Sequence, residues 1–137
     1  MEQKSSRNFD LLTLGQVLLR LSPPDNERLS RGDTFVKQVG GAELNVAVGA
    51  SLLGLHTGVI SKLPAHDIGS FMKGKIRSFG VSDDFFMYDH SPSARLGIYY
   101  YENGAYPRKP KVIYDRNNSS FFSLDINEIP QEVYTAS

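Results

Sequence analysis

Apolar and polar residues alternate along the chain with two different periods, which predict strands in some segments and helices in others. The almost wholly apolar run Phe9–Leu21 is short and predicts one strand of a parallel sheet, buried on both faces. Residues 22–25 carry turn chemistry that ends this strand. Residues 34–39 alternate apolar with polar side chains and predict a strand with one solvated face.

Two segments have helical spacing. Beyond the double glycine at 40–41 apolar residues recur every three or four positions, and Gly54 provides a stop. Asp67 is placed to cap a second helix, which Gly80 ends. The predicted apolar faces consist of Leu44, Ala47, Val48, Leu52 and Leu55 in the first helix, and of Ile68, Phe71, Met72, Ile76 and Phe79 in the second.

Short strands at 59–60 and 85–88 complete an alternation of strands and helices. This order predicts an α/β fold with a parallel sheet and right-handed crossovers. Residues 95–102 and 111–116 are rich in β-forming residues and predict a long hairpin. Together with the 34–39 strand, the hairpin is expected to form a small separate sheet over the α/β layer.

Length and charge narrow the classes of function. The 137 residues suffice for one domain, and 15 basic residues balance 15 acidic ones, so there is no basic excess to bind nucleic acid. The absence of cysteine excludes disulfides and favours a cytoplasmic location. No apolar run is long enough to span a membrane, and residues 1–8 are interpreted as a disordered tail.

The double glycine before the first helix is a candidate ligand site. Gly40 and Gly41 allow a ligand to approach the backbone, and free amides of the first helical turn favour anionic or hydroxyl-rich groups. Asn45 offers a side-chain amide to sugar hydroxyls. The alternative is a tight strand-to-helix turn followed by an ordinary surface Asn, and spacing alone favours it.

The hairpin offers a second candidate surface. Because side chains alternate along a strand, Tyr114 and Arg116 share one face, and Tyr99 lies in the partner strand. Tyrosine combines an apolar ring with a hydroxyl, and arginine has a planar fork suited to carboxylates or phosphates. The alternative is a surface ion pair of Arg116 with Glu102 or Asp115.

Other familiar chemistries are not indicated. His56, His66 and His90 are too scattered for a metal motif, so no metal site is predicted. The sequence has no P-loop, and Gly15 lacks the two further glycines of a dinucleotide fingerprint.

Three segments together resemble the ribokinase (PfkB) family of carbohydrate kinases, most closely the 2-keto-3-deoxygluconate kinases. They are TLGQVLLRLSPP at 13–24, GGAELNVAVGASLLGL at 40–55, and the pair RLGIYYYENGA with KVIYDRNNSSF at 95–105 and 111–121. Two positions differ from the general family pattern. Gln16 stands where Glu is usual, and Glu43 replaces a small residue, as is typical of the keto-deoxygluconate branch.

The resemblance implies a ribokinase-like sheet in which a sugar lies between the α/β layer and a β-sheet lid. Gly41 would then lie against the sugar, and Tyr99 and Tyr114 would line the lid. Arg116 would hold the carboxylate of an acid sugar, and Asn45 would contact the sugar. ATP and Mg²⁺ would serve the full-length enzyme and not bind this chain alone.

The resemblance also predicts which parts are missing. The family's Gly-Ala-Gly-Asp signature, whose Asp is the catalytic base, is not in the sequence, nor is its Asn-x-x-Glu. We therefore expect a truncated chain that is inactive alone, with the base beyond Ser137. The resemblance further implies a homodimer formed through the lid. Two alternatives stay open: another PfkB sugar kinase such as a fructokinase, or a non-catalytic sugar-binding or dimerisation module.

Overall fold

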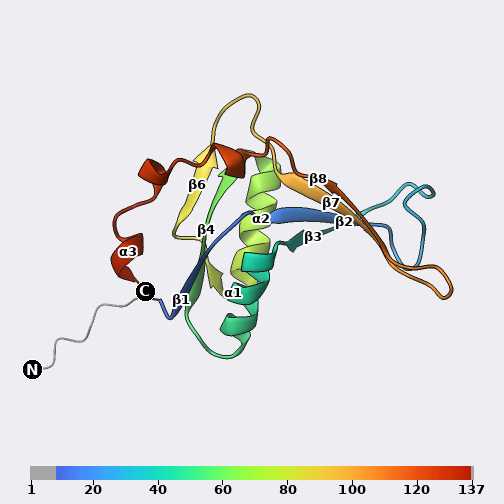
Figure 1. Cartoon of the computed structure of the whole chain (residues 1–137), viewed down its shortest axis with the longest axis horizontal. Coiled ribbons are helices and arrows are strands. Elements are labelled where there is room, and N and C mark those ends of the chain that lie inside the picture. The colour runs from blue at the N-terminus through green and yellow to red at the C-terminus, as the bar shows by residue number, and fades with distance from the viewer. Residues whose placement is uncertain (1–8, 137) are drawn as a thin grey trace, which may run out of the picture.

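The computed structural model describes residues 9–136, which form an α/β layer and a second four-stranded sheet that extends from it (Figure 1). The predicted tail 1–8 lies outside the described residues. The first sheet is parallel and consists of β1 (Leu11–Leu14), β4 (Thr57–Pro64), β5 (Val81–Ser82) and β6 (Phe86–Asp89). The second sheet consists of β2 (Leu18–Ser22), β3 (Val36–Gly40), β7 (Gly97–Glu102) and β8 (Lys111–Asp115). The helical elements are α1 (Ala42–Leu52), α2 (Asp67–Ser78), the 3-10 turns η1 (Ser120–Ser123) and η2 (Ile126–Glu128), and α3 (Val133–Ala136).

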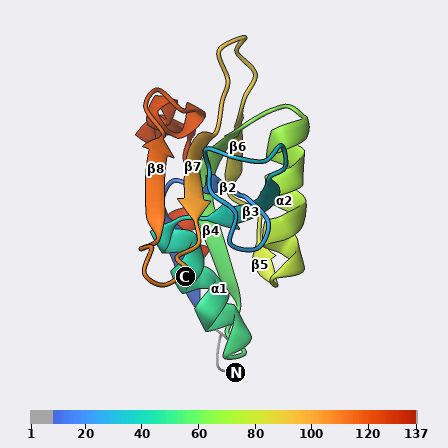
Figure 2. The same cartoon turned by 90° about the vertical axis from the view of Figure 1, so that its right-hand side faces the viewer.

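The predicted α/β fold, with a parallel sheet, two main helices and a small additional sheet, is confirmed. Figures 1 and 2 show α1 and α2 on one face of the first sheet and the segment after β8 on the other. In Figure 2 the second sheet lies in the order β3-β2-β7-β8. Within residues 9–136, none of the helices has the length and apolarity needed to cross a bilayer.

The prediction of a single strand over Phe9–Leu21 is wrong. The run contains two strands, β1 and β2, which belong to different sheets. β1 pairs with β4, whereas β2 lies between β3 and β7. Phe9 and Leu12 of the first part pack in the cluster that includes α3, whereas the second part packs in the larger core, so both parts are apolar and hydropathy alone does not show the change of sheet. Val17 and Leu19 of the second part are buried there.

Helix α1 only partly matches its predicted face. Leu44 and Ala47 are buried against the first sheet, but Leu52 and Leu55 are exposed. The helix packs on β1, β4 and β5, and Leu52 in its last turn is not covered. It ends at Leu52, shortly before Gly54.

Helix α2 starts at Asp67, but Asp67 is not its cap as predicted. His66 is the N-cap, because its Nδ1 accepts a hydrogen bond of 3.2 Å from the amide of Ile68. Met72 and Ile76 are buried as predicted. The outer members of the predicted face, Ile68 and Phe79, are exposed since they lie at its ends.

One apolar core connects the two sheets. Its buried members come from β2, α1, β4, α2, β5, β6 and the residues just before β2 and β7, namely Val17, Leu19, Leu44, Ala47, Val59, Leu63, Met72, Ile76, Val81, Phe86 and Leu96. A second cluster on the other face of the first sheet holds α3 through Val133 and Ala136. Because the first core includes both sheets, it fixes the second sheet relative to the end of β1.

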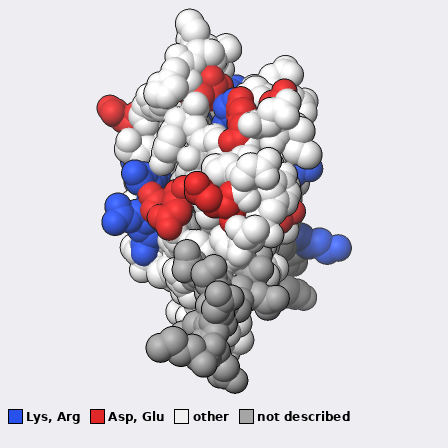
Figure 3. Space-filling view, turned by 90° about the vertical axis from the view of Figure 1, so that its left-hand side faces the viewer, with Lys and Arg blue, Asp and Glu red and all other residues white. Residues whose placement is uncertain are grey.

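Figure 3 shows the side of the molecule that carries α3. Acidic side chains gather across the middle of this face, and basic side chains lie toward its margins. The charges of both signs are therefore mixed on this surface.

Candidate functional site

A cleft of about 460 Å³ lies where the chain passes from the first sheet to the second. Its walls come from the end of β1 and the start of β2, from the first turn of α1, and from the segment after β8. The lining residues are Leu14, Gly15, Gln16, Leu18, Gly41, Ala42, Glu43, Arg116, Phe121 and Phe122. The cleft lies beyond the carboxyl end of parallel strand β1, which is the usual ligand-binding edge of open α/β sheets.

Gly41, the second residue of the double glycine, lines one wall of this cleft. Gly41 is the N-cap of α1 with φ of 124°, and no side chain caps the helix. A Cβ at Gly41 would lie 2.6 Å from the carbonyl oxygen of Gln16, so only glycine fits there. Gly40 is buried next to the side chain of Tyr99. A Cβ at Gly40 would lie too close to the hydroxyl oxygen of Tyr99 for both to fit. The close approach of the backbone predicted at these glycines therefore serves first to bring the two sheets together.

The two tyrosines predicted as a pair are adjacent in the second sheet. Tyr99 and Tyr114 are cross-strand partners of β7 and β8, and their ring centroids are 6.0 Å apart. The Cζ of Arg116 lies 5.0 Å from the centroid of the Tyr114 ring. Since Tyr99 also contacts Gly40, the structure connects the double glycine, both tyrosines and Arg116 on one face of the second sheet.

The alternative in which Arg116 forms a surface ion pair does not occur in the structure. Asp115 is bound by Arg95, with 3.0 Å between Nη2 and Oδ1. Glu102 accepts a hydrogen bond of 2.8 Å from the amide of Leu29. Within residues 9–136, Arg116 forms no ion pair, and its guanidinium is stacked on Tyr114 at the cleft.

Asn45 is not brought together with the other predicted residues. It lies exposed on α1, one turn after Gly41, and it is not among the residues that line the cleft. Among the six predicted residues only Gly41 and Arg116 line the cleft, and Gly40, Tyr99 and Tyr114 belong to the adjoining second sheet.

Of the ten residues that line the cleft, sequence reasoning proposed only Gly41 and Arg116 as ligand-binding, and four of the other eight form contacts that define its walls. The Gln16 side chain donates a hydrogen bond of 2.5 Å from Nε2 to Oγ of Ser119. The Glu43 carboxylate lies over Gly15, where a Cβ would overlap it. Phe121 and Phe122 form an edge-to-face pair with centroids 5.9 Å apart. One indication of Gln16 and Glu43 was present in the sequence, because these are the two positions at which it departs from the family pattern.

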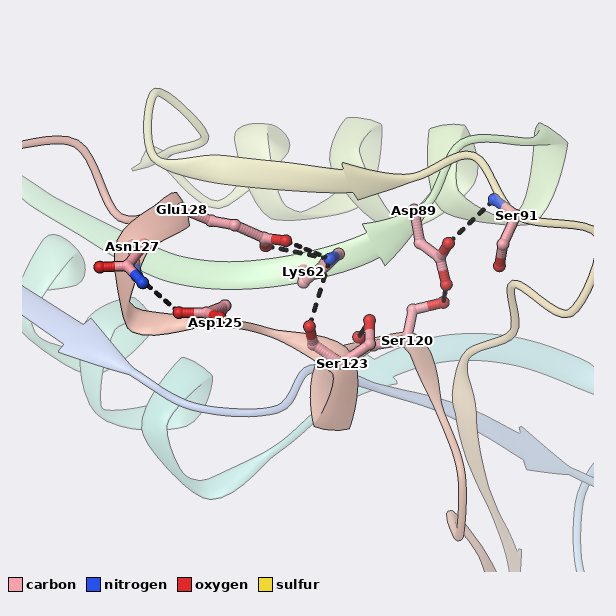
Figure 4. A network of polar contacts seen from close by, with 8 residues as sticks. All are labelled: Lys62, Asp89, Ser91, Ser120, Ser123, Asp125, Asn127 and Glu128. Carbon is pink, nitrogen blue, oxygen red and sulfur yellow. Dashed lines mark hydrogen bonds and ion pairs between the residues drawn. The ribbon is translucent and has the colours of Figure 1, made fainter.

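A network of polar contacts holds the segment that carries these phenylalanines (Figure 4). Ser120 donates a hydrogen bond of 2.7 Å to Asp89 at the end of β6, and the amide of Ser91 donates one of 2.9 Å. Lys62 of β4 forms an ion pair of 2.9 Å with Glu128. Hydrogen bonds from Ser91 and from Ser120 lower the pKa of Asp89 below its usual value. The network therefore attaches η1 and η2 to the carboxyl end of the first sheet.

The described residues offer little for metal binding. Within residues 9–136, no group of three His, Asp or Glu side chains converges as ligands of an ion. The cleft presents the polar side chains of Gln16, Glu43 and Arg116 to an organic ligand, whereas Tyr99 and Tyr114 lie on the second sheet and are not among its lining residues.

Comparison with known proteins gives consistent matches along nearly the whole chain. The family model described as pfkB family carbohydrate kinase matches residues 8–134. A 2-dehydro-3-deoxygalactonokinase of Haloferax volcanii is 36% identical over 124 residues, which cover 90% of this chain and 38% of the relative. The chain thus spans little more than a third of the length of this curated relative.

Solved structures agree with this result. A crystal structure of 2-dehydro-3-deoxygluconokinase from Thermotoga maritima is 38% identical with a TM-score of 0.83, covering 89% of this chain and 36% of that one. An uncharacterised sugar kinase from Pyrococcus horikoshii in complex with ATP is 24% identical with a TM-score of 0.77, covering 90% of this chain and 39% of the other. At that identity the second likeness shows the shared fold alone.

Proposed function

This chain belongs to the pfkB family of carbohydrate kinases, and from this membership we propose that it forms the sugar-binding part of an ATP-dependent kinase for 2-keto-3-deoxygluconate. The names of its relatives support an acid sugar as the substrate, since they include 2-dehydro-3-deoxygalactonokinase and 2-dehydro-3-deoxygluconokinase.

The observation that carries the proposal is the unpaired arginine at the cleft. Arg116 stacks on Tyr114 while the neighbouring carboxylates are bound by other groups, so its guanidinium is available to a ligand. A guanidinium forms two parallel hydrogen bonds with a carboxylate, which fixes orientation as well as charge. A neutral sugar would have no group that requires this residue.

The residues of this chain have binding roles in the proposed reaction. The second sheet acts as a lid in which Tyr99 and Tyr114 cover the sugar, Gly41 lets it approach the start of α1, and Arg116 orients the carboxylate. Holding the sugar in one orientation removes much of the entropic barrier to phosphoryl transfer. Covering it excludes water that would otherwise accept the phosphoryl group.

ATP would supply the phosphoryl group, and Mg²⁺ would neutralise the negative charge of its phosphates. The described residues do not present a set of metal ligands, and the sequence has no Gly-Ala-Gly-Asp segment, so we assign no step of the transfer to them. The proposed activity is therefore that of a protein in which this chain occurs together with those groups. A reaction that consumes ATP favours the cytoplasm as its location.

The test compares acid and neutral sugars in the protein at its natural length. We expect kcat/KM for 2-keto-3-deoxygluconate to exceed that for fructose. Arg116→Ala should lower the acid-sugar value by about 2 kcal/mol, roughly thirtyfold, because a buried carboxylate loses its partner. Arg116→Lys should recover only part, and the KM for ATP should not change.

Two results would contradict the proposal. One is a preference of the wild-type protein for fructose, which would favour a fructokinase. The other is an equal small loss for both sugars in Arg116→Ala, which would make Arg116 a surface residue of the sheet.

A further inference from the structure

Strand β2 carries two buried polar atoms that have no partner. Within residues 9–136, four buried side-chain atoms form no hydrogen bond, and two of them are Nε of Arg20 and Oγ of Ser22. Residues two apart on a strand point to the same face, so both atoms lie on one face of the second sheet. Buried polar groups without partners are rare because they destabilise the folded state, and a ligand is one cause of their retention.

This face is the one that carries the proposed sugar site. Arg20 is the cross-strand partner of Tyr99, which in turn is the partner of Tyr114. Leu18, two residues before Arg20 on β2, lines the cleft. Arg20 therefore lies in the row of the two tyrosines, immediately beyond the cleft wall.

Arg20 also lacks a counter-charge. The contact of its guanidinium is the ring of Tyr101, with 5.9 Å between Cζ and the ring centroid. No carboxylate of residues 9–136 forms an ion pair with Arg20, whereas Arg95 and Arg108 of the same region are paired with acids. A partly buried, unpaired cation is unfavourable for stability, so its presence on a binding face indicates an anionic ligand.

We propose that Arg20 is a second anion-binding residue of this site, which binds the carboxylate of an acid sugar from the side opposite Arg116. Arg20 on β2 lies beside Tyr99, whereas Arg116 lies two residues beyond Tyr114 of β8, so the two arginines are on opposite sides of β7 and diagonal to each other. Neighbouring strands are about 4.8 Å apart and successive residues about 3.3 Å, so the two positions are separated by roughly 12 Å, which two arginine side chains span around one carboxylate. The hydroxyl of Ser22 adds a hydrogen-bond donor on the same face. This inference rests on the proposed function.

The test measures binding and stability together in the protein at its natural length. Arg20→Met keeps the length and apolar body of the side chain, Arg20→Lys keeps the charge, and Arg31→Met is a matched control in an exposed loop. We measure Kd for 2-keto-3-deoxygluconate and for fructose by calorimetry, and Tm with and without each sugar.

Arg20→Met should raise Kd for the acid sugar by at least about tenfold and leave Kd for fructose unchanged. Arg20→Lys should recover part of the loss, and Arg31→Met should bind as the wild type does. Without sugar, Arg20→Met should melt at the same or a higher temperature, because an apolar side chain replaces an unpaired cation. A residue with only a structural role would instead lower Tm.

Each other outcome overturns the inference. If Arg116→Ala loses the acid sugar while Arg20→Met retains it, the role of Arg20 is wrong and the proposed function stands. If the wild-type protein does not bind the acid sugar, both are wrong. If Arg20→Met keeps its affinity but changes the oligomeric state, the partner of Arg20 is a carboxylate of a second subunit.

Discussion

Gly41 and Gly49 lie at the start and in the middle of the same helical region and depend differently on the lack of a side chain. At Gly41 the positive φ and the nearby carbonyl oxygen of Gln16 exclude a Cβ. At Gly49 a Cβ would meet nothing within 4 Å. Gly41→Ala should therefore lower the free energy of unfolding by about 1–3 kcal/mol. Gly49→Ala should raise it by roughly 0.5–1 kcal/mol, since alanine favours the helix.

Urea unfolding of the two variants and the wild type measures this difference. Opposite signs are the expected result. Equal destabilisation by both would show that the turn at Gly41 adapts to a side chain, and the backbone approach would then not depend on glycine.

Among single residues, those on strands could be predicted from the sequence and those on loops could not. Alternation placed Tyr114 and Arg116 on one face, and the structure brings them to 5.0 Å between the ring centroid and Cζ. Asn45 lies exposed on α1 outside the cleft lining, and its contact with a sugar stays a prediction. Gln16 reaches the cleft from the turn between β1 and β2 and Glu43 reaches it from the first turn of α1, and no local pattern describes this meeting of the two segments.

At the scale of elements, the attachment of η1 to β6 through Asp89 gives a dependence on pH. The folded-state pKa of Asp89 is lowered by hydrogen bonds from Ser91 and Ser120, whereas the ordinary value is 3.8. The unfolded state therefore binds the proton more readily than the folded state. The stabilisation is fully present above about pH 4 and is lost as the pH falls through the folded-state pKa.

The variant Asp89→Asn lacks this contribution at every pH. We expect its Tm to lie below that of the wild type at pH 6, and the difference to become smaller as the pH falls from about 4 to 3. Asp33→Asn, which changes an exposed carboxylate in the loop before β3, is the control and should give a nearly constant difference. A constant difference for Asp89→Asn as well would mean that the contact with Ser120 contributes nothing through ionisation.

Helices and strands with a regular spacing of apolar residues could be predicted from the sequence. The point at which the chain passes from one sheet to the other could not. The spacing of Met72 and Ile76 identified α2, and both are buried. The run Phe9–Leu21 is apolar on both sides of Gly15 and Gln16, because each of its two parts packs in an apolar cluster, so hydropathy does not show that β1 and β2 belong to different sheets. The cap of α2 was misassigned since His66 and Asp67 are both able to accept the hydrogen bond that starts a helix.

At the scale of the whole molecule, the order of strands and helices in the sequence identified the α/β class. The exposed apolar surface at the end of α1 could not be predicted from the sequence, because it depends on how the helix packs on the sheet. Leu52 and Leu53 are 78% and 83% exposed, although the helical pattern assigned Leu52 to the core. Adjacent exposed leucines on a helix end are unfavourable in water, and they favour association with another apolar surface. Further exposed apolar residues, Ile126 and Tyr134, line a separate groove beside β1.

We therefore expect the 137-residue chain by itself to associate as its concentration rises. The double variant Leu52→Lys with Leu53→Gln should reduce this association, and its free energy of unfolding should stay within about 0.5 kcal/mol of the wild type because neither side chain is packed. Ser70→Lys adds the same single charge on exposed α2 and is the matched control, which should associate as the wild type does. Sedimentation over a hundredfold range of concentration measures the three proteins. A wild-type chain that stays monomeric throughout would contradict the expected association. A control that loses association to the same degree as the double variant would show that net charge, and not the leucine surface, governs association, since only the double variant removes that surface.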